Sequence, residues 1–416
     1  MTVVRRIRAA RRVRGTIFLP GDKSISHRYA MLGAIAEGTT ELRGFASSAD
    51  CQSSLNCIQA LGIDVHREDN LVTIMGRGPN GLKEPAGDLD AGNSGSTVRM
   101  LAGILAGQPF KSRLVGDASL SRRPMKRIID PLIQMGARLQ SSPGWLLPLE
   151  IQGGVLAPIS YQSPVASAQV KTAVLFAGLF AEGETLVKEP VATRNHTELA
   201  LEQMGVQVER HNQAVSVRGR ARLNAVKVQV PGDISSAAFF VAAALMLPGS
   251  EIVLEGVGLN PTRTAIIELL KGMGAQIEVD NFQIASGEPM GDVRVSFAPL
   301  EGGEIPVEMI PGVIDELPVL AVLGTRTRQG LSFRGAAELR VKESDRLRAV
   351  AENLRRMGGE VEELPDGLRV PGRQTLHGGE VESYRDHRIA MAFAVAGLTT
   401  PDGVAINGSE CAGISF

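Results

Sequence analysis

The 416-residue sequence has few aromatic residues and almost no net charge. Aromatic residues make up 4% of the chain, so platforms on which nucleic-acid bases could stack are not expected. The formal net charge is −1, from 44 basic and 45 acidic residues, whereas a nucleic-acid-binding domain is usually basic. No apolar run is long enough to span a bilayer. We therefore expect no nucleic-acid partner and no membrane association, and any affinity for anions must come from local clusters of cations.

Cysteine is also scarce. Cys51, Cys57 and Cys411 are the three cysteines of the chain. Their number is odd and their spacing is not that of a metal site, so we expect reduced thiols, a cytoplasmic protein and no metal ligands.

The first residues are rich in Arg and contain no acid. An Arg-rich start is compatible with a transit peptide, but such peptides are also Ser-rich, and this segment is not. We therefore favour a solvated pair of strands that leads into Thr16–Leu19. The arginines concerned are Arg5, Arg6, Arg8, Arg11, Arg12 and Arg14.

A Leu-Gly or Met-Gly pair recurs at intervals of roughly 70 residues, too long for a solenoid repeat. Each pair follows an amphipathic stretch and precedes an alternating one, so the Gly fits the left-handed position that ends a helix. The pairs are Leu61-Gly62, Met135-Gly136, Met204-Gly205, Met273-Gly274 and Met357-Gly358.

Polar turns between these pairs lead into helices of small apolar residues, which are typical of buried helices. The turns begin near residues 20, 92, 164, 231, 312 and 385. The two patterns together predict an α/β protein built from about six β-α-β-α-β-β units. Six units are too many for one core, so we expect three in each of two domains. Residues 1–20 with 233–416 would form one domain and residues 21–232 the other, with the functional site in a cleft between them.

Several other helix starts carry cations. These loops are Ser119–Arg123, Thr193–His196 and Lys342–Arg346, with a weaker one at Pro261–Arg263. A helix start has free N–H groups and a partial positive charge. Acids usually stabilise that position, so cations there indicate a bound anion. No Walker or dinucleotide-binding fingerprint is present, so a nucleotide is not indicated.

Each motif alone has a plainer interpretation. Lys342 and Arg346 could pair with Glu343 and Asp345 on a solvated face. Residues 385–388 could form a structural network of ion pairs, and residues 92–96 could form an ordinary turn that caps a helix. The stretch from Pro20 to Arg28 is more specific, because two cations bracket a helix start rich in hydroxyl groups. Because all of these motifs occupy corresponding places in the repeat, we favour anion binding.

In order along nearly the whole chain, these motifs are similar to those of the enolpyruvyl transferases. The stretches that carry the resemblance are Leu19–Arg28, Gly92–Arg99, Gly116–Leu120, Arg123–Met125, Ala166–Lys171, Asp315–Glu316, Arg340–Leu347 and Asp386–Met391. The resemblance implies a two-domain inside-out α/β barrel with buried parallel helices. It also implies transfer of the carboxyvinyl group of phosphoenolpyruvate to the 5-hydroxyl of shikimate 3-phosphate, with release of phosphate and without a cofactor.

The resemblance also implies which residues bind the two substrates. For shikimate 3-phosphate they are Ser24, Arg28, Ser167, Ala168, Gln169 and Arg194. For phosphoenolpyruvate they are Lys23, Arg123, Arg346, Arg388 and the turn at Gly95, with Arg99 and Lys171 as further candidates. Asn93, Lys342 and His387 belong to the same motifs and complete the expected set of ligands.

The reaction needs acid and base groups around one carbon. Phosphoenolpyruvate must be protonated at its methylene carbon while the attacking hydroxyl loses a proton, and the tetrahedral intermediate then loses phosphate and a methyl proton. We expect Asp315 and Glu343 to supply the carboxylates, with Lys23 as a proton-transfer partner. Asp315 would also contact the ring hydroxyls, and the cations would stabilise the departing phosphate.

The sequence departs from the family at four places. Ile414 stands where some members have Lys, Ala168 where others have Ser, and Glu338 where others have Asn. The sequence ends at Phe416 where relatives continue, so we expect a shortened C-terminal end. We interpret these differences as divergence within one reaction. Gly95 lacks the methyl group that crowds glyphosate in some relatives, so we expect inhibition by glyphosate.

Three alternatives have different sequence requirements. Transfer to UDP-N-acetylglucosamine would need a uridine pocket and a different opening motif from Lys23–Arg28. A non-catalytic anion-binding protein would not place Asp315 and Glu343 among its cations. Nucleic-acid binding through the N-terminal arginines is disfavoured by the net charge. No interface patch stands out, so we expect a monomer.

Overall fold

The computed structural model describes residues 3–414, so Phe416 lies outside the described residues. The chain forms two compact units. Unit 1 contains the described residues up to Pro20, Pro231–Ile284 and those from Pro289 onward, and unit 2 contains Gly21–Val230 with Ala285–Glu288. The sequence predicted that the chain would cross between domains after residues 20 and 232. It gave no sign that residues 285–288 would belong to a different unit from the residues before and after them.

Unit 2 has three central helices, and each begins at a capping side chain. Asp22, Ser94 and Ser167 accept hydrogen bonds from backbone N–H groups in the first turn, which satisfies donors that a helix start leaves free. The helices are α1 (Lys23–Ile35), α3 (Gly95–Ala106) and α5 (Ala168–Gly178). Three further helices are α2 (Ala49–Ala60), α4 (Lys126–Gln134) and α6 (His196–Gln203).

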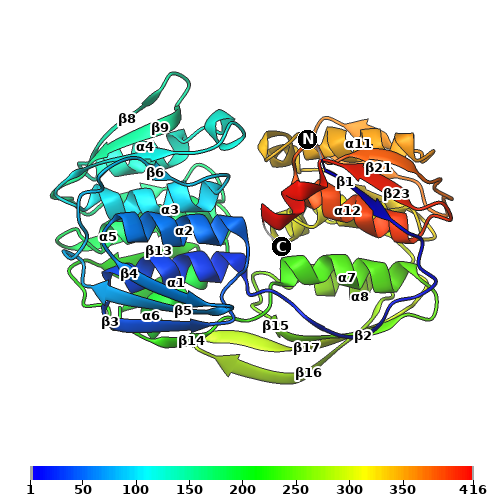
Figure 1. Cartoon of the computed structure of the whole chain (residues 1–416), viewed down its shortest axis with the longest axis horizontal. Coiled ribbons are helices and arrows are strands. Elements are labelled where there is room, and N and C mark those ends of the chain that lie inside the picture. The colour runs from blue at the N-terminus through cyan, green and yellow to red at the C-terminus, as the bar shows by residue number, and fades with distance from the viewer. Residues whose placement is uncertain (1–2, 415–416) are drawn as a thin grey trace. The chain divides into compact units, whose positions relative to one another are not determined.

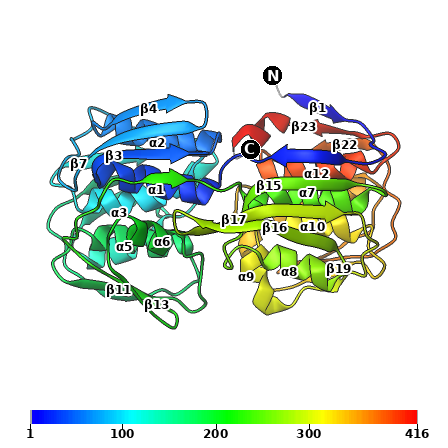
Figure 2. The ribbon, with the colours of Figure 1, turned by 90° about the horizontal axis from the view of Figure 1, so that it is seen from below.

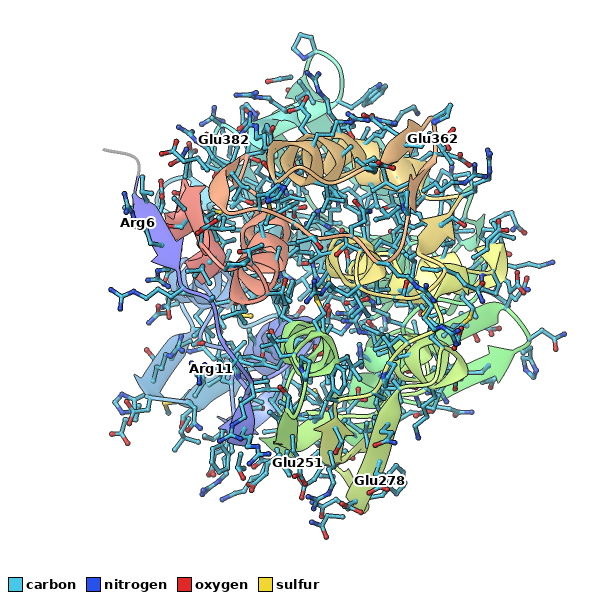
Figure 3. All side chains as sticks on the ribbon, turned by 90° about the vertical axis from the view of Figure 1, so that its right-hand side faces the viewer. Arg6, Arg11, Glu251, Glu278, Glu362 and Glu382 are labelled. Atoms are coloured by element: carbon cyan, nitrogen blue, oxygen red, sulfur yellow. The ribbon has the colours of Figure 1, made fainter. Side chains whose placement is uncertain are left out.

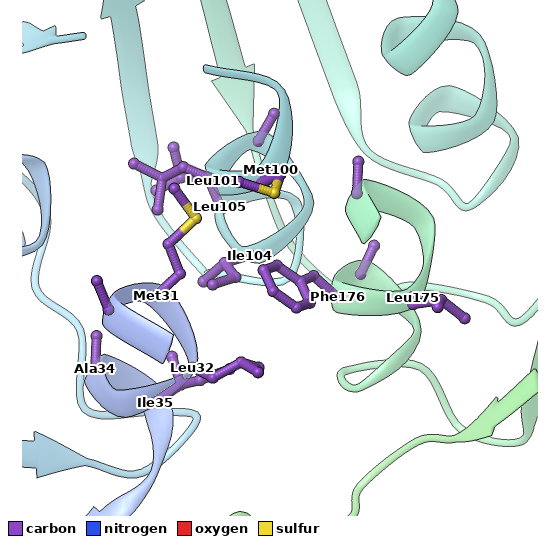
Figure 4. Close-up of a cluster of buried hydrophobic side chains, with 14 of the residues drawn as sticks. Met31, Leu32, Ala34, Ile35, Met100, Leu101, Ile104, Leu105, Leu175 and Phe176 are labelled. Atoms are coloured by element: carbon purple, nitrogen blue, oxygen red, sulfur yellow. The ribbon is translucent and has the colours of Figure 1, made fainter. Parts of the chain in front are cut away.

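Apolar side chains of the three central helices meet in the core of unit 2. Met31 of α1, Leu105 of α3 and Phe176 of α5 are at most 1% exposed and lie close to one another in Figure 4. Glycine makes the close approach possible: a Cβ on Gly103 of α3 would lie 2.1 Å from the carbonyl oxygen of Ala173. The expectation of buried helices made of small residues is confirmed here.

Three four-stranded sheets surround these helices. Their strand orders are β14-β3-β5-β4, β6-β7-β9-β8 and β10-β11-β13-β12. In each sheet the first two strands are parallel and the last two form an antiparallel hairpin. Figure 2 shows β3 and β4 on one side of α1 and α3, and β11 and β13 on the other. The strands are β3 (Glu37–Arg43), β4 (Asp64–Glu68), β5 (Leu71–Arg77), β6 (Leu89–Asp90), β7 (Lys111–Val115), β8 (Arg138–Ser142), β9 (Leu146–Gln152), β10 (Ser160–Gln162), β11 (Glu184–Lys188), β12 (Val208–His211), β13 (Ala214–Arg218) and β14 (Lys227–Gln229).

Unit 1 has the same organisation. Its central helices are α7 (Ile234–Met246), α10 (Leu317–Gly324) and α12 (His387–Leu398), and all three contact one another. The other helices are α8 (Ala265–Gly272), α9 (Ile310–Val313) and α11 (Arg346–Arg356), with short 3₁₀ turns at Leu120–Arg122 in unit 2 and at Val307–Met309, Ala337–Val341 and Ser409–Ile414 in unit 1. In Figure 1, α7 lies between α12 and the sheet that contains β2 and β15.

The sheets of unit 1 have the orders β16-β17-β15-β2, β18-β19-β21-β20 and β1-β23-β22. The strands are β1 (Val4–Ile7), β2 (Arg14–Phe18), β15 (Glu251–Gly258), β16 (Gln276–Ala285), β17 (Glu288–Ser296), β18 (Gly303–Glu304), β19 (Leu331–Phe333), β20 (Glu362–Leu364), β21 (Gly367–Val370), β22 (Gly379–Glu382) and β23 (Val404–Asn407). The expectation of a mixed α/β chain in two domains is confirmed. The six sheets are separate, however, and none closes into a hydrogen-bonded barrel within residues 3–414.

Three of the N-terminal arginines, Arg5, Arg6 and Arg14, lie on strands, but these strands do not pair with each other. β1 is antiparallel to β23, and β2 is parallel to β15. The predicted strand pair is therefore wrong, because each strand completes a sheet whose other members come from much later in the chain. Arg6 projects from the outer face of β1, as Figure 3 shows.

The five predicted helix-ending glycines all have positive φ angles, between 75° and 106°. Each follows the residue that caps the helix: Leu61, Met135, Met204, Met273 and Met357. A side chain would be strained in this conformation, which explains why Gly recurs there. This prediction is confirmed.

Candidate functional site

Several residues of unit 1 that the sequence predicts to be functional surround one buried arginine. Arg346, the first residue of α11, is 2% exposed. It contacts three carboxylates: Nη2 lies 2.6 Å from Glu343 Oε2, Nε lies 2.8 Å from Asp386 Oδ2, and Nη1 lies 3.5 Å from Asp315 Oδ1. We call Asp315, Lys342, Glu343, Arg346, Asp386 and Arg388 the unit 1 cluster. The plainer interpretation of Lys342 and Arg346 as a solvated face is wrong, because Arg346 is buried.

The charges of this cluster determine how its most buried groups titrate. Burial alone would lower the pKa of Arg346, but Asp386, Glu343 and Asp315 raise it above its ordinary value. Burial would raise the pKa of Asp386, but the charge of Arg346, together with His387 and the hydrogen bond from Arg346, brings that pKa below its ordinary value. Both groups therefore stay ionised at neutral pH.

Asp315 lies among cations from two segments of unit 1, Lys342–Arg346 and the start of α12. Lys342 Nζ is 3.8 Å from Asp315 Oδ1, and Arg388 Nη1 donates a 2.8 Å hydrogen bond to the backbone oxygen of Asp315. Arg388 also lies 3.5 Å from Glu316. The structure thus brings together the two predicted catalytic carboxylates and the three cations predicted in unit 1.

Asp386 links this cluster to the start of α12. Its Oδ1 accepts a hydrogen bond from the backbone N–H of Arg388 at 2.9 Å, and its Oδ2 accepts one from the Ser344 hydroxyl at 3.0 Å. His387, at the first position of α12, is 2% exposed. The plainer interpretation of residues 385–388 is therefore partly right: Asp386 is structural, while Arg388 faces Asp315.

Two residues that depart from the family's pattern, Glu338 and Ile414, contact other residues of unit 1. Glu338 forms an ion pair with Lys342 at 3.2 Å, so an acid there partly offsets the cation. Ile414 packs, partly buried, against the apolar core of unit 1.

In unit 2, Lys23 forms an ion pair with Asp50. Lys23 Nζ lies 3.0 Å from Asp50 Oδ2, and the two side chains are 21% and 10% exposed. Lys23 begins α1, and Asp50 lies in the first turn of α2. Asp50 was not predicted from the sequence, because it is 27 residues from Lys23 and an acid in the first turn of a helix is common for stability alone.

A second polar group in unit 2 joins Asn93, Asp117 and Arg123. The Asn93 amide donates to Asp117 Oδ2 at 2.7 Å, and Arg123 Nη2 donates to Asn93 Oδ1 at 2.8 Å and to Ser119 Oγ at 3.1 Å. Asp117 also accepts hydrogen bonds from the backbone N–H groups of residues 119 and 120. It thereby fixes the loop that presents Arg123. We call Lys23, Asp50, Asn93, Asp117 and Arg123 the unit 2 cluster.

Arg28 ties three helices together. Its Nε donates to Thr197 Oγ1 at 2.7 Å, its Nη2 to Thr172 Oγ1 at 3.0 Å, and its Nη1 to the backbone oxygen of Ser24 at 2.8 Å. Burial lowers the pKa of Arg28 to about 10, while the charge of Glu198 opposes that shift. The guanidinium therefore stays charged at neutral pH. Thr172 and Thr197 were not recognised from the sequence, since isolated threonines carry no motif.

The starts of α3 and α5 are joined by side chains. Arg99 Nη1 donates to Gln169 Oε1 at 3.0 Å, and Gln169 Nε2 donates to Ser96 Oγ at 2.9 Å. Ser167, Ala168 and Arg194 are half-buried, and Gly95 is the first residue of α3. The sequence grouped most of these residues but did not predict that Arg99 and Gln169 would pair.

Lys171 has a different environment from the other cations. It is 2% exposed, and its Nζ lies 3.0 Å from Glu189 Oε2 and 2.7 Å from Glu198 Oε1. Both carboxylates are also buried. Its ammonium therefore neutralises two interior acids instead of lying open toward an anion.

Within residues 3–414, no group of three or more His, Cys, Asp and Glu side chains is placed to hold a metal ion. None of the helices in this range has the length and apolar character needed to cross a membrane.

Comparison with known proteins gives a whole-chain match. Residues 7–416 match the EPSP synthase family, 3-phosphoshikimate 1-carboxyvinyltransferase. The chain is 53% identical to the 3-phosphoshikimate 1-carboxyvinyltransferase of Solibacter usitatus (strain Ellin6076), over 99% of this chain and 97% of the relative. It is 52% identical to the protein of that name from Koribacter versatilis (strain Ellin345), over 99% and 96%. A solved structure of EPSP synthase from Acinetobacter baumannii is similar with a TM-score of 0.89 and 43% identity, over 100% of this chain and 96% of that one.

Proposed function

The chain belongs to the EPSP synthase family, and on that premise we propose that the unit 1 and unit 2 clusters carry out its reaction. The protein is a transferase that moves the enolpyruvyl group of phosphoenolpyruvate to shikimate 3-phosphate in the shikimate pathway. The observation that carries the assignment of residues is the placement of Asp315 and Glu343 against Arg346. A simple anion clamp would gain nothing from two carboxylates there, whereas proton transfer requires them.

In unit 2, the cations of the cluster hold phosphoenolpyruvate. Lys23 and Arg123 each keep a polar partner in the structure, Asp50 and Asn93 respectively. These partners hold the two cations in position before the substrate anion arrives, which limits the entropy lost on binding. Gly95 and Arg99 lie at the start of α3, where backbone N–H groups favour an anion.

Shikimate 3-phosphate is bound by residues at the starts of α1 and α5 and by the loop before α6. The residues are Ser24, Arg28, Ser167, Ala168, Gln169 and Arg194. Support comes from the hydrogen bonds of Arg28 to Thr172 and Thr197, which bring α1, α5 and α6 together. Asp315 adds contacts with the ring hydroxyls.

In unit 1, Arg346, Arg388, Lys342 and His387 complete the binding of the two anions. Their charge also favours the phosphate that leaves, because fixed cations stabilise negative charge as it develops.

The reaction proceeds by addition and then elimination. The 5-hydroxyl oxygen of shikimate 3-phosphate forms a bond to C2 of phosphoenolpyruvate, and its proton passes to a base. C3 gains a proton and becomes a methyl group, which gives a tetrahedral intermediate. The C2–O bond to phosphate then breaks, and a proton leaves the methyl group to restore the double bond. Glu343 and Lys23 exchange protons with C3, and Asp315 accepts the hydroxyl proton.

Isotope incorporation tests this course. In deuterated water, the intermediate carries a CH₂D group, so its deprotonation leaves deuterium in the vinyl methylene of the product. Mass spectrometry and proton NMR of the product measure this label. A product formed with an unlabelled methylene at partial conversion would contradict the addition step. The same reaction after dialysis against a chelator tests our expectation that neither a metal nor an organic cofactor is needed.

Membership of the EPSP synthase family also supports a finer description of the repeats and domains. We propose that the six sheets mark six β-α-β-α-β-β repeats, three in each domain, with unit 1 and unit 2 as the domains. Support comes from the shared order of parallel pair and hairpin in the four-stranded sheets. We also propose that the protein is a cytoplasmic monomer, which light scattering of the purified chain and fractionation of its source cells would test.

A further inference from the structure

A chain of buried hydrogen bonds links three helices in unit 2. His27 Nδ1 lies 2.7 Å from Ser54 Oγ, Ser54 Oγ lies 2.8 Å from Thr97 Oγ1, and Thr97 Oγ1 donates to Ser94 Oγ at 2.8 Å. Each of these four side chains is 0% exposed. We call His27, Ser54, Thr97 and Ser94 the buried relay. It links α1, α2 and α3, and none of its members is among the expected substrate ligands.

The number of protons fixes the direction of the relay. Thr97 has one hydroxyl proton and donates it to Ser94 at 2.8 Å or to the backbone oxygen of Asp50 at 3.5 Å. In either case the bond between Thr97 and Ser54 must use the proton of Ser54. Ser54 then accepts from His27, which assigns the proton of the imidazole to Nδ1. The other ring nitrogen, Nε2, is buried without a hydrogen-bond partner among the described residues. An imidazole with one proton suits this setting, in which burial and the charges of Lys23 and Arg28 hold the pKa of His27 well below its ordinary value.

Both ends of the relay lie next to proposed ligands of phosphoenolpyruvate. His27 is one helical turn after Lys23 in α1. At the other end, Ser94 caps α3 through the backbone N–H of Thr97 at 3.1 Å, and it lies between Asn93 and Gly95. In the middle, Thr97 Oγ1 lies 3.5 Å from the backbone oxygen of Asp50, the partner of Lys23.

We propose that the buried relay is a positioning device, which holds the loop at Asn93–Gly95 in register with Lys23 and Asp50 and thereby sets the affinity for phosphoenolpyruvate. Its members touch no substrate and act through their neighbours. Arg28, Thr172 and Thr197 form a separate network around the proposed shikimate 3-phosphate ligands. Loss of the relay should therefore affect one substrate more than the other. This inference rests on the proposed assignment of ligands in unit 2.

Thr97→Val is the most direct test, because valine keeps the shape of threonine but removes the hydroxyl group. Thr185→Val is the matched control: Thr185 is also 0% exposed, lies in β11, and its hydroxyl has no hydrogen-bond partner among the described residues. We expect the KM for phosphoenolpyruvate to rise about tenfold in Thr97→Val, below the roughly hundredfold effect that a 1 Å misplacement can cause. The KM for shikimate 3-phosphate should change less than twofold, and Thr97→Ser should restore the wild-type value.

Hydrogen exchange supplies a readout that does not depend on turnover. Exchange of the backbone amides in residues 92–98 should quicken in Thr97→Val but not in Thr185→Val. Unchanged exchange and unchanged KM for phosphoenolpyruvate would overturn the proposal, as would equal increases in both KM values. If Thr97→Val does not fold, Ser54→Ala, which removes the central hydroxyl group from α2, must show the same selective effect. Absence of turnover in the wild-type protein would instead refute the proposed function, and the exchange experiment would still decide the role of the relay.

Discussion

Arg346 and Asp386 form a buried ion pair between the first residue of α11 and the residue that caps α12. Their side chains are 2% and 0% exposed, and the Nε to Oδ2 distance is 2.8 Å. The same arginine contacts Glu343 and Asp315. The buried pair therefore holds in place the guanidinium group that both proposed catalytic carboxylates contact.

Asp386→Asn should destabilise the protein and impair its activity. The change leaves the Arg346 charge without its fully buried partner, and loss of one member of a buried pair typically costs about 3–5 kcal/mol. Urea unfolding measures the change in the free energy of unfolding, and the KM for phosphoenolpyruvate should rise in parallel. Arg369→Gln is the control, since Arg369 and Glu362 form an exposed pair at 3.2 Å that should contribute about 1 kcal/mol or less. Equal effects of the two substitutions would contradict this account.

Acid should reduce the difference in stability between the wild type and Asp386→Asn. Because the pKa of Asp386 is lowered in the folded protein, the folded state binds fewer protons than the unfolded state. The stabilisation that the Asp386 charge provides is fully present above the unfolded pKa of about 3.9. It is lost as the pH falls through the lower pKa of the folded state. Unfolding measured from pH 6 down to the acid limit should show the gap closing below about pH 4. A gap that stays constant would mean that Asp386 does not stabilise the fold through its charge.

Glu343→Gln should reduce kcat while binding of both substrates persists. Glutamine keeps the shape of the side chain but cannot exchange a proton, and general acid–base catalysis contributes about 10²–10⁴-fold. Steady-state turnover assays give kcat, and isothermal titration calorimetry gives the affinity for each substrate. Glu338→Gln serves as the control, because Glu338 pairs with Lys342 but is 42% exposed. A Glu343→Gln enzyme that turns over normally would remove this residue from the mechanism.

Gly95→Ala should weaken inhibition by glyphosate. A Cβ at this position would lie 2.5 Å from Arg99 Nη1, so Arg99 must move from its hydrogen bond with Gln169 and the space at the start of α3 shrinks. We expect the wild type to be inhibited by glyphosate in competition with phosphoenolpyruvate. The variant should need at least about tenfold more inhibitor, a difference of about 1.4 kcal/mol. Gly154→Ala is the control, since a Cβ there meets nothing within 4 Å. Undiminished wild-type turnover at inhibitor levels well above the KM for phosphoenolpyruvate would contradict the expectation.

Local patterns in the sequence were sufficient to predict the helix ends and the buried helices. Gly62 and Gly358 adopt positive φ angles because the end of a helix requires that conformation at a single residue. The wholly apolar run in α7 predicts its burial in the same local way.

Long-range pairings could not be read from the sequence. β1 pairs with β23 across almost the whole chain, and Arg28 bonds to Thr197, which is 169 residues away. No local pattern specifies such partners, because they depend on how whole sheets and helices come together. The same reason explains why Asp50, Thr97 and Ser54 were missed, while Lys23, Arg346 and Glu343 were found from their motifs.

Phosphate release with two acceptors tests the central claim most directly. The purified protein is mixed with phosphoenolpyruvate and either shikimate 3-phosphate or UDP-N-acetylglucosamine, and free phosphate is measured over time. We predict one phosphate released for each shikimate 3-phosphate consumed and no release above background with the nucleotide sugar. Release with UDP-N-acetylglucosamine, or none with shikimate 3-phosphate, would contradict the account.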